Sequence, residues 1–139
     1  MIQIIAGEKG KGKTKILIEK VNTAVREAKG SIVYLDKSNK HMYELSNKLR
    51  LINVKDYFID NSDEFLGFIC GLISQDHDLE AVYLDSFLKI ADIKDQNILP
   101  VLNKLDRISQ QFHVDFVISI SLNEKDLPES VKKDIIVSL

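Results

Sequence analysis

The sequence Gly-Glu-Lys-Gly-Lys-Gly-Lys-Thr at residues 7–14 is the most specific motif of this chain. Its fixed positions, Gly7, Gly12, Lys13 and Thr14, have the spacing G-x-x-x-x-G-K-T of a phosphate-binding loop. In such a loop, successive backbone N–H groups form a concave nest for phosphate, the lysine reaches the β- and γ-phosphates, and the threonine hydroxyl can ligate Mg²⁺. The stretch therefore predicts a site for the phosphates of a nucleotide.

The residues on both sides of this loop favour a strand and a helix. Residues 2–6 form a short apolar run of the kind found in a buried strand, and residues 13–29 repeat apolar side chains at helical spacing. The N-terminus of a helix carries about half a positive charge, which stabilises a bound phosphate. Strand, glycine loop and helix thus follow one another in the order that phosphate binding requires.

Every residue of the loop is a candidate contact for the nucleotide. Lys13 is also a candidate catalytic residue, because its ammonium group reaches the β- and γ-phosphates. Lys9 and Lys11 either add positive charge beside the phosphates or point into solvent, and the sequence favours neither. The residues of this segment that we expect to bind nucleotide are Gly7, Glu8, Lys9, Gly10, Lys11, Gly12, Lys13, Thr14 and Lys15.

Further along the chain, apolar runs typical of strands alternate with segments of helical spacing. The predicted strands are 31–36, 51–54, 80–85, 115–121 and 134–139. The predicted helices are 39–50, 62–75 and 96–112, and a turn or short helix is expected at 126–132. Asn61 or Ser62 is the expected cap of the helix at 62–75, and Pro100 must lie in the first turn of the last helix.

This alternation indicates the fold class. Strands that are continuously apolar and alternate with helices are typical of a parallel sheet covered on both faces. We expect an α/β fold, a three-layer αβα sandwich with a mostly parallel sheet of five or six strands. The length of 139 residues is that of a single domain, which we place over residues 1–139.

Composition and charge exclude several classes of function. The chain is 45% hydrophobic and 29% charged, with a net charge of −2 at pH 7, so it offers no overall basic character for nucleic acid or an anionic membrane. No apolar run approaches the roughly 20 residues that span a bilayer. The single cysteine, Cys70, has no partner for an internal disulfide. We therefore expect a cytoplasmic protein without nucleic-acid or membrane partners.

Polar residues end several of the predicted strands. Ligands of parallel α/β sheets bind at the carboxyl ends of the strands, and Asp36, Asp85 and Ser121 all lie there. An aspartate that ends an apolar strand downstream of a phosphate loop can hold Mg²⁺, usually through a bound water. Thr14 and Asp85 are therefore the predicted metal ligands. The alternative for Asp85 is a turn residue at the exit of its strand.

The pattern of elements over roughly residues 1–121 resembles the RecA-like ATPases of the P-loop NTPase superfamily. The matching pieces are the loop at 7–14, IVYLD at 32–36, LINV at 51–54, NSDEFL at 61–66, AVYLDSFLKI at 81–90 and FVISIS at 116–121. In that family the second strand also ends in Asp, as at Asp36, and the Mg²⁺-binding strand ends in Asp-Ser, as at Asp85-Ser86. The resemblance implies a RecA-like fold that binds ATP and Mg²⁺.

Two positions depart from this family, and both concern hydrolysis. The family carries a water-activating glutamate just after its second strand, where this chain has Ser38. Its sensor strand ends in a Gln or a similar amide that responds to the γ-phosphate, where this chain has Ser121. We assign Ser121 to the nucleotide site. Asp36 is the candidate substitute for the missing catalytic base, with a turn residue at the strand end as the alternative.

Two further absences shape the prediction. Residues 122–126 contain the letters of the guanine-reading motif Asn/Thr-Lys-x-Asp in the wrong spacing, which favours ATP. Kinases of small molecules usually gather several arginines around the transferred phosphate. None of the three arginines of this chain lies in a loop predicted at the active edge, and Arg50 is the candidate for an arginine supplied by a neighbouring subunit. The three are Arg26, Arg50 and Arg107.

These observations favour a protein that binds Mg-ATP and acts as a weak or partner-stimulated ATPase or as a nucleotide switch. Its partner would be another protein or further copies of the same chain. The alternative is a regulatory or scaffold protein that binds nucleotide without hydrolysing it. A third interpretation rests on residues 10–14, which are similar to the loop of the corrinoid adenosyltransferases and would imply adenosyl transfer.

Overall fold

The computed structural model describes residues 1–94 and 97–139. The strands of its sheet are β1 (Ile2–Ala6), β2 (Ser31–Asp36), β3 (Arg50–Asn53), β4 (Leu79–Leu84), β5 (Asp115–Ile120) and β6 (Ile135–Ser138). The α-helices of this part are α1 (Lys13–Glu27), α2 (Ser62–Ser74), α3 (Phe87–Ile90) and α4 (Leu99–Phe112). Short 3₁₀ segments are η1 (Met42–Glu44), η2 (Val54–Tyr57), η3 (Glu124–Asp126) and η4 (Glu129–Asp134). Among the described residues, no helix combines the length and the apolar character needed to cross a bilayer.

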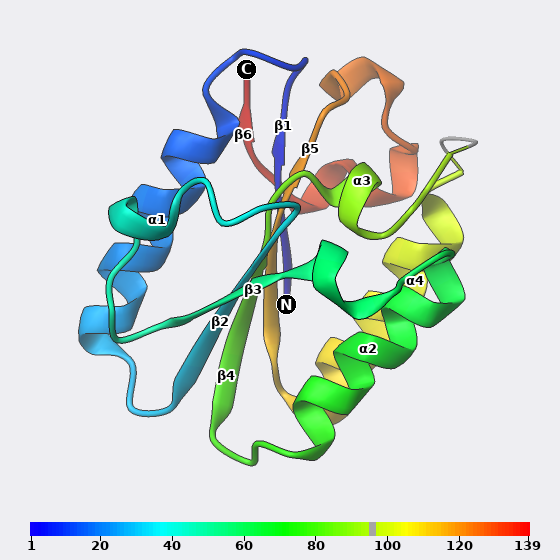
Figure 1. The fold of residues 1–139 in the computed structure, drawn as a ribbon. Helices are drawn as coiled ribbons and strands as arrows, with labels where there is room; N and C mark the ends of the chain where they lie inside the picture. The colour runs from blue at the N-terminus through cyan, green and yellow to red at the C-terminus, as the bar shows by residue number, and fades with distance from the viewer. Residues whose placement is uncertain (95–96) are drawn as a thin grey trace.

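The six strands form one sheet in the order β3-β2-β4-β5-β1-β6, and all neighbouring strands pair in parallel. Figure 1 shows α1 on one side of the sheet and α2 and α4 on the other. The predicted three-layer α/β sandwich is therefore confirmed, with a sheet of six strands that is parallel throughout.

Each face of the sheet has its own apolar core, because successive side chains of a strand point to opposite faces. On one face, Leu17 and Val21 of α1 pack with Ile5, Tyr34 and Val117 of the strands. On the other face, a larger core joins α2 and α4 to the alternate strand residues. The fully buried members of that core include Ile4, Leu84, Phe65, Leu105 and Ile118.

The strand order brings the polar strand ends together. β5 lies between β1, which leads into the glycine loop, and β4, which leads into Asp85. β2 lies on the other side of β4, and the Asp85 N–H donates to the Leu35 carbonyl over 2.9 Å, which places Asp36 and Asp85 at the same edge. The sites predicted from separate stretches of sequence thus meet at one edge of the sheet.

The predicted helix at 39–50 is wrong. The structure has only η1 there, and Met42 and Tyr43 are exposed while Leu45 is buried. The backbone of this segment makes only single-turn hydrogen bonds within itself, such as Glu44 N–H to the His41 carbonyl, and it is also held by a side chain of α1. Asn22 donates to the Glu44 carbonyl and accepts from the Ser46 N–H, over 2.9 and 2.8 Å. A helical spacing of three apolar residues was therefore overridden by a tertiary contact.

The remaining elements agree with the prediction, with small differences. The short helix α3 was not predicted, and it follows β4 where a connection at 87–95 was expected. Pro100 lies in the first turn of α4, as expected, and Asn61 caps α2 by accepting from the Glu64 N–H over 2.9 Å. The predicted start of the last helix at residue 96 lies outside the described residues.

Candidate functional site

The glycine loop has the backbone conformation that its glycines permit. Gly10 and Gly12 have φ angles of 86° and 93°, in the left-handed region where residues with a Cβ are strained. A Cβ added at either position would meet no atom within 4 Å, so backbone conformation and not lack of space accounts for these two glycines. The loop then enters α1 directly, with Gly12 immediately before its first residue, Lys13.

Lys13 folds back into this loop. Its Nζ donates to the Glu8 carbonyl over 2.9 Å, and the residue is only 7% exposed. Burial lowers the pKa of Lys13, and the nearby Asp85 carboxylate opposes that effect. The ammonium group is thus held inside the loop by a single backbone acceptor, which a phosphate oxygen can replace as a stronger, charged partner.

Thr14 and Asp85 meet across the site, as predicted for a pair that holds a metal. The Thr14 hydroxyl donates to Asp85 Oδ1 over 3.3 Å. Thr14 lies in the first turn of α1, and Asp85 follows the last residue of β4, 71 positions later. The contact depends on the sheet order, because α1 follows the β1 loop and crosses the end of β5 to reach β4.

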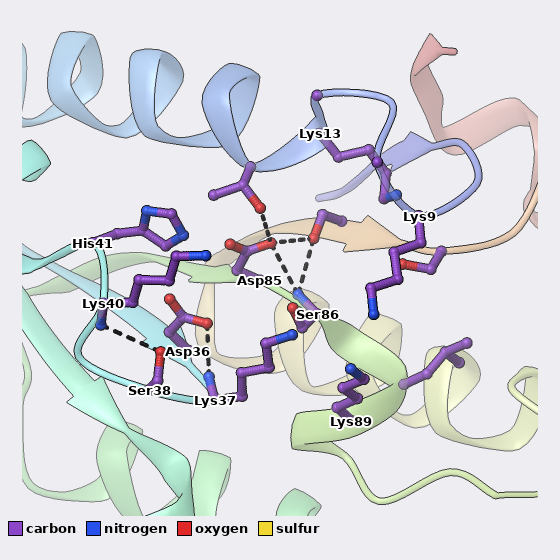
Figure 2. Close-up of a pocket in the computed structure, with 16 residues that line it drawn as sticks. Lys9, Lys13, Asp36, Lys37, Ser38, Lys40, His41, Asp85, Ser86 and Lys89 are labelled. Atoms are coloured by element: carbon purple, nitrogen blue, oxygen red, sulfur yellow. Dashed lines mark hydrogen bonds between the residues drawn. The ribbon is translucent and has the colours of Figure 1, made fainter.

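Asp85 is fixed by a network of donors. Oδ1 accepts from the Ser119 hydroxyl over 2.6 Å and from the Ser86 N–H over 2.9 Å, and Oδ2 accepts from the Tyr34 hydroxyl over 3.0 Å. Burial, and then the charge of Asp85, strongly raise the pKa of Tyr34, so the phenol remains a donor. This network keeps both oxygens of the carboxylate in one orientation beside Thr14 (Figure 2).

Asp36 is also buried at the site but is less completely satisfied. It is 2% exposed, and Oδ1 accepts from the Lys37 N–H over 2.7 Å. Oδ2 is buried without a hydrogen-bond partner among the described residues. Burial, and then the charge of Asp85, raise the pKa of the Asp36 carboxyl. This oxygen is free to accept a hydrogen bond from a ligand or water.

These residues line a cavity of about 490 Å³ at the carboxyl edge of the sheet. Five lysines and two aspartates contribute to its wall, so the cavity carries positive charge although the whole chain is slightly negative. A cleft with charge of one sign concentrates ligands of the opposite sign. The charged residues of the wall are Lys9, Lys13, Lys37, Lys40, Lys89, Asp36 and Asp85.

The donors at this site fit Mg²⁺. Mg²⁺ prefers oxygen ligands, and it usually keeps several waters while binding one or two carboxylates and the phosphates of a substrate. The Thr14 hydroxyl and the Asp85 carboxylate supply such oxygen atoms in the wall of the cavity. Residues 1–94 and 97–139 contain no cluster of three or more His, Cys, Asp or Glu that would hold a metal without phosphates.

The predicted site residues fall into two groups. Those that line the cavity are Lys9, Gly10, Gly12, Lys13, Thr14, Asp36, Asp85 and Ser121. Those that do not line it are Gly7, Glu8, Lys11 and Lys15. Gly7 packs against Leu139 and donates its N–H to the Leu122 carbonyl over 2.8 Å, and the Glu8 side chain accepts from Asn123 over 2.8 Å. Lys11 and Lys15 are exposed.

The structure also brings in residues that the sequence did not indicate. Tyr34 and Ser119 donate hydrogen bonds to Asp85, and each is a polar side chain within an apolar run of its strand, which is the signal that could have revealed them. Three charged or polar residues of the wall, Lys37, Lys40 and His41, come from the connection after β2; Lys40 and His41 lie where a helix was predicted. Lys89 comes from the unpredicted α3. None of the three arginines lines the cavity.

Comparisons with known proteins were made on sequence and on structure. The sequence matches no protein-family model and no curated protein. The structure is similar to a KaiC-like protein from the hyperthermophilic archaeon Pyrococcus horikoshii OT3, with a TM-score of 0.61 and 20% identity over 87% of this chain and 61% of the other. It is also similar to the flagellar accessory protein FlaH from Methanocaldococcus jannaschii, with a TM-score of 0.60 and 18% identity over 95% and 65% of the two chains.

These similarities show the fold. The chain has the RecA-like three-layer architecture that its motifs predicted. The chain spans between three fifths and two thirds of the length of the two solved structures.

Proposed function

We propose that this protein binds Mg-ATP in the cavity at the end of the sheet, and that it hydrolyses ATP slowly or under stimulation by a partner, as a nucleotide switch. The single domain over residues 1–139 would carry the whole site. The observation that supports this most strongly is the meeting of three predicted features in one cavity: the loop lysine Lys13, the Thr14–Asp85 pair and the carboxyl ends of the strands.

Each residue has a distinct role in this proposal. The N–H groups of the loop, at the N-terminus of α1, and the Lys13 ammonium group bind the phosphates. Thr14 and Asp85 hold Mg²⁺, directly or through water, and the bound ion offsets the negative charge of the phosphates. Ser119 and Tyr34 position the Asp85 carboxylate by donating hydrogen bonds to it. Ser121 lies in the cavity wall, within the space that a nucleotide would occupy.

Asp36 is the proposed base for hydrolysis. Its Oδ2 has no other hydrogen-bond partner among the described residues, so it can accept a proton from a water in the cavity. A general base is most effective when its pKa lies near the working pH, and burial moves the pKa of Asp36 upward in that direction. Ser38 lines the same cavity, but its hydroxyl accepts from the Lys40 N–H and cannot replace a glutamate as base.

A regulatory protein that binds nucleotide without turnover is the second candidate. The observation that favours it is the small number of carboxylates that could act as a base in the cavity wall. They are Asp36 and Asp85, and Asp85 already accepts hydrogen bonds from four donors. Phosphate release by the wild type separates the two functions. If Asp36 is the base, Asp36→Asn should slow that release by roughly 10²- to 10⁴-fold while Mg-ATP still binds. A wild type that binds Mg-ATP and releases no phosphate, even with cell extract as a source of partners, supports the second function.

Binding itself is tested at Lys13. Lys13→Ala should weaken Mg-ATP binding by on the order of 1.5–3 kcal/mol, the range for hydrogen bonds to charged groups, as measured by isothermal titration calorimetry. Lys15→Ala is the matched control, because Lys15 is an exposed lysine two residues away that does not line the cavity. A wild type that shows no binding of Mg-ATP would refute the proposal, and so would an equal loss in the two variants.

A further inference from the structure

We propose that Lys9, Lys37 and Lys89 form a subsite for the terminal phosphoryl group of the bound nucleotide, so that a single chain distinguishes a nucleoside triphosphate from a diphosphate. This inference rests on the proposed function and adds to it the residues that contact the third phosphate. It also assigns to lysines of the same chain the positive charge that the three arginines do not bring to this cavity.

The three lysines come from separate parts of the fold and converge. Lys9 belongs to the glycine loop, Lys37 follows the last residue of β2, and Lys89 lies in α3, just after Asp85. Figure 2 shows their side chains reaching toward a common space in front of Ser86, on the opposite side of Asp85 from His41. The glycine loop, the connection after β2 and α3 thus each contribute one of the three ammonium groups.

In the part of the chain that the structure describes, none of these three ammonium groups has a carboxylate oxygen within 4.0 Å. The ion pairs within 4.0 Å there are Met1–Asp115, His41–Glu44, Lys94–Asp92 and Lys132–Glu129. The pKa of Lys89 is lowered, first by its contact with the Lys37 ammonium group and then by the charges of Lys37 and Lys9. Three cations that repel one another at the mouth of a cavity are stabilised when an anion binds between them.

A second observation points to a ligand in the same space. Asp36 lies next to Lys37 in the chain and lines the same cavity with only 2% of its surface exposed. Its Oδ2 has no hydrogen-bond partner among the described residues. A buried acceptor of this kind calls for a donor, such as a water held beside the phosphoryl group. Cations on one side and a free carboxylate oxygen on the other suit a phosphoryl group together with the water that attacks it.

The terminal phosphoryl group is the occupant that the geometry favours. Lys9 is part of the loop that holds the other phosphates, so an anion that it contacts lies next to them. A diphosphate would leave the three lysines unpaired, whereas a triphosphate would supply the missing negative charge. The affinity for triphosphate should therefore depend on these lysines more than the affinity for diphosphate does.

The test compares Mg-ATP with Mg-ADP by isothermal titration calorimetry in the wild type, Lys37→Ala, Lys89→Ala and the double variant. Each single change should weaken Mg-ATP roughly five- to tenfold and Mg-ADP less than about twofold, because charge-assisted hydrogen bonds to the third phosphate are lost. In the double variant the preference for Mg-ATP over Mg-ADP should fall further than in either single variant, while Lys9 and Lys13 remain in place. Lys55→Ala is the matched control: Lys55 is exposed and outside the cavity, yet its charge also acts on Lys89.

The other outcomes are distinct. Equal losses for Mg-ATP and Mg-ADP, or no loss for either, would overturn the subsite while leaving the proposed function intact. If the wild type binds neither Mg-ATP nor Mg-ADP, the proposed function is refuted and the subsite with it. A third outcome combines two results: inorganic phosphate binds the ADP complex of the wild type but not that of the double variant, and the ratio of the affinities for Mg-ATP and Mg-ADP is the same in both proteins. This outcome would assign the lysines to a separate phosphate and overturn this inference.

A readout without nucleotide excludes a merely structural role. Removing Lys37 or Lys89 relieves repulsion between like charges, so the ligand-free variants should unfold at the same temperature as the wild type or higher. Variants that unfold at a clearly lower temperature would show that the lysines support the fold, which contradicts the proposal.

Discussion

Asp36 is a buried carboxyl group with one oxygen that has no hydrogen-bond partner among the described residues. Such a group costs folding free energy, because a buried charge without full compensation is less stable than the same charge in water. Proteins retain costly groups of this kind mainly at functional sites. The same feature therefore supports the proposed catalytic role and predicts a measurable effect on stability.

The raised pKa of Asp36 determines the sign of its pH effect. Because the folded protein binds this proton more tightly than the unfolded chain, whose value is near 3.8, protonation favours folding. The stabilising contribution is present below pH 3.8 and is lost as the pH rises through the folded pKa. Above that value the ionised carboxylate weakens the fold.

Asp36→Asn should consequently stabilise the protein at neutral pH by on the order of 1 kcal/mol, because the neutral amide removes a buried charge and a tenfold change in an acid dissociation constant corresponds to about that free energy. The gain should disappear as the pH approaches 3.8, where the wild-type carboxyl is itself neutral. Thermal unfolding followed by circular dichroism between pH 4 and pH 8 measures the difference. A difference that does not change with pH would contradict this account of Asp36.

At the scale of elements, the segment 38–48 connects β2 to β3 and carries cavity residues without forming a regular helix. It is held on α1 by Asn22, which makes one hydrogen bond as donor and one as acceptor to its backbone. Leu45 adds a buried apolar contact on the same face of the sheet. The position of Lys40 and His41 at the cavity therefore depends on a side chain of the helix that follows the phosphate loop.

Asn22→Ala should destabilise the protein by about 1–2 kcal/mol, since two hydrogen bonds are lost and two backbone groups are left without partners. Amide hydrogen exchange should increase first at residues 42–48 and leave β4 and β5 protected. Thr23→Ala is the control, because the Thr23 hydroxyl donates to the Glu19 carbonyl and accepts from Arg26, both within α1. Equal exchange in both variants would show that Asn22 does not hold the segment.

At the scale of the whole molecule, the site is assembled from strand ends that are far apart in sequence. The glycine loop follows β1, Asp36 ends β2 and Asp85 follows β4. These three parts of the site come together only in the complete parallel sheet. A ligand that contacts all three therefore binds only the folded state. Binding of this kind stabilises the folded state by mass action.

Mg-ATP at about 100 times its Kd should stabilise the protein by about 2.7 kcal/mol and raise its unfolding temperature by roughly 5–10 °C. Removal of Mg²⁺ with a chelator should reduce the shift, because Thr14 and Asp85 then lose the ion that connects them to the phosphates. Thermal unfolding with and without each component measures both effects. Lys13→Ala should show little shift, and a full shift in that variant would place the nucleotide elsewhere.

The loop, the strands and the fold class could be predicted from local patterns of residues. The spacing of glycines, lysine and threonine at 7–14 is a local property, and continuous apolar runs report burial on both faces of a sheet whichever strands are neighbours. For the same reason Asp36 and Asp85 could be placed at strand ends from their position after such runs. These predictions needed no knowledge of distant contacts.

Only the tertiary structure decided which side chains meet. The strand order inserts β5 between β1 and β4, and this places Ser119 on Asp85, a contact that no local pattern contains. The helix expected at 39–50 gave way to hydrogen bonds with Asn22, because backbone groups can be satisfied by a distant side chain as well as by a helix. Lys37, Lys40 and Lys89 could not be assigned to the cavity from sequence, since they lie on segments whose course is set by contacts between elements.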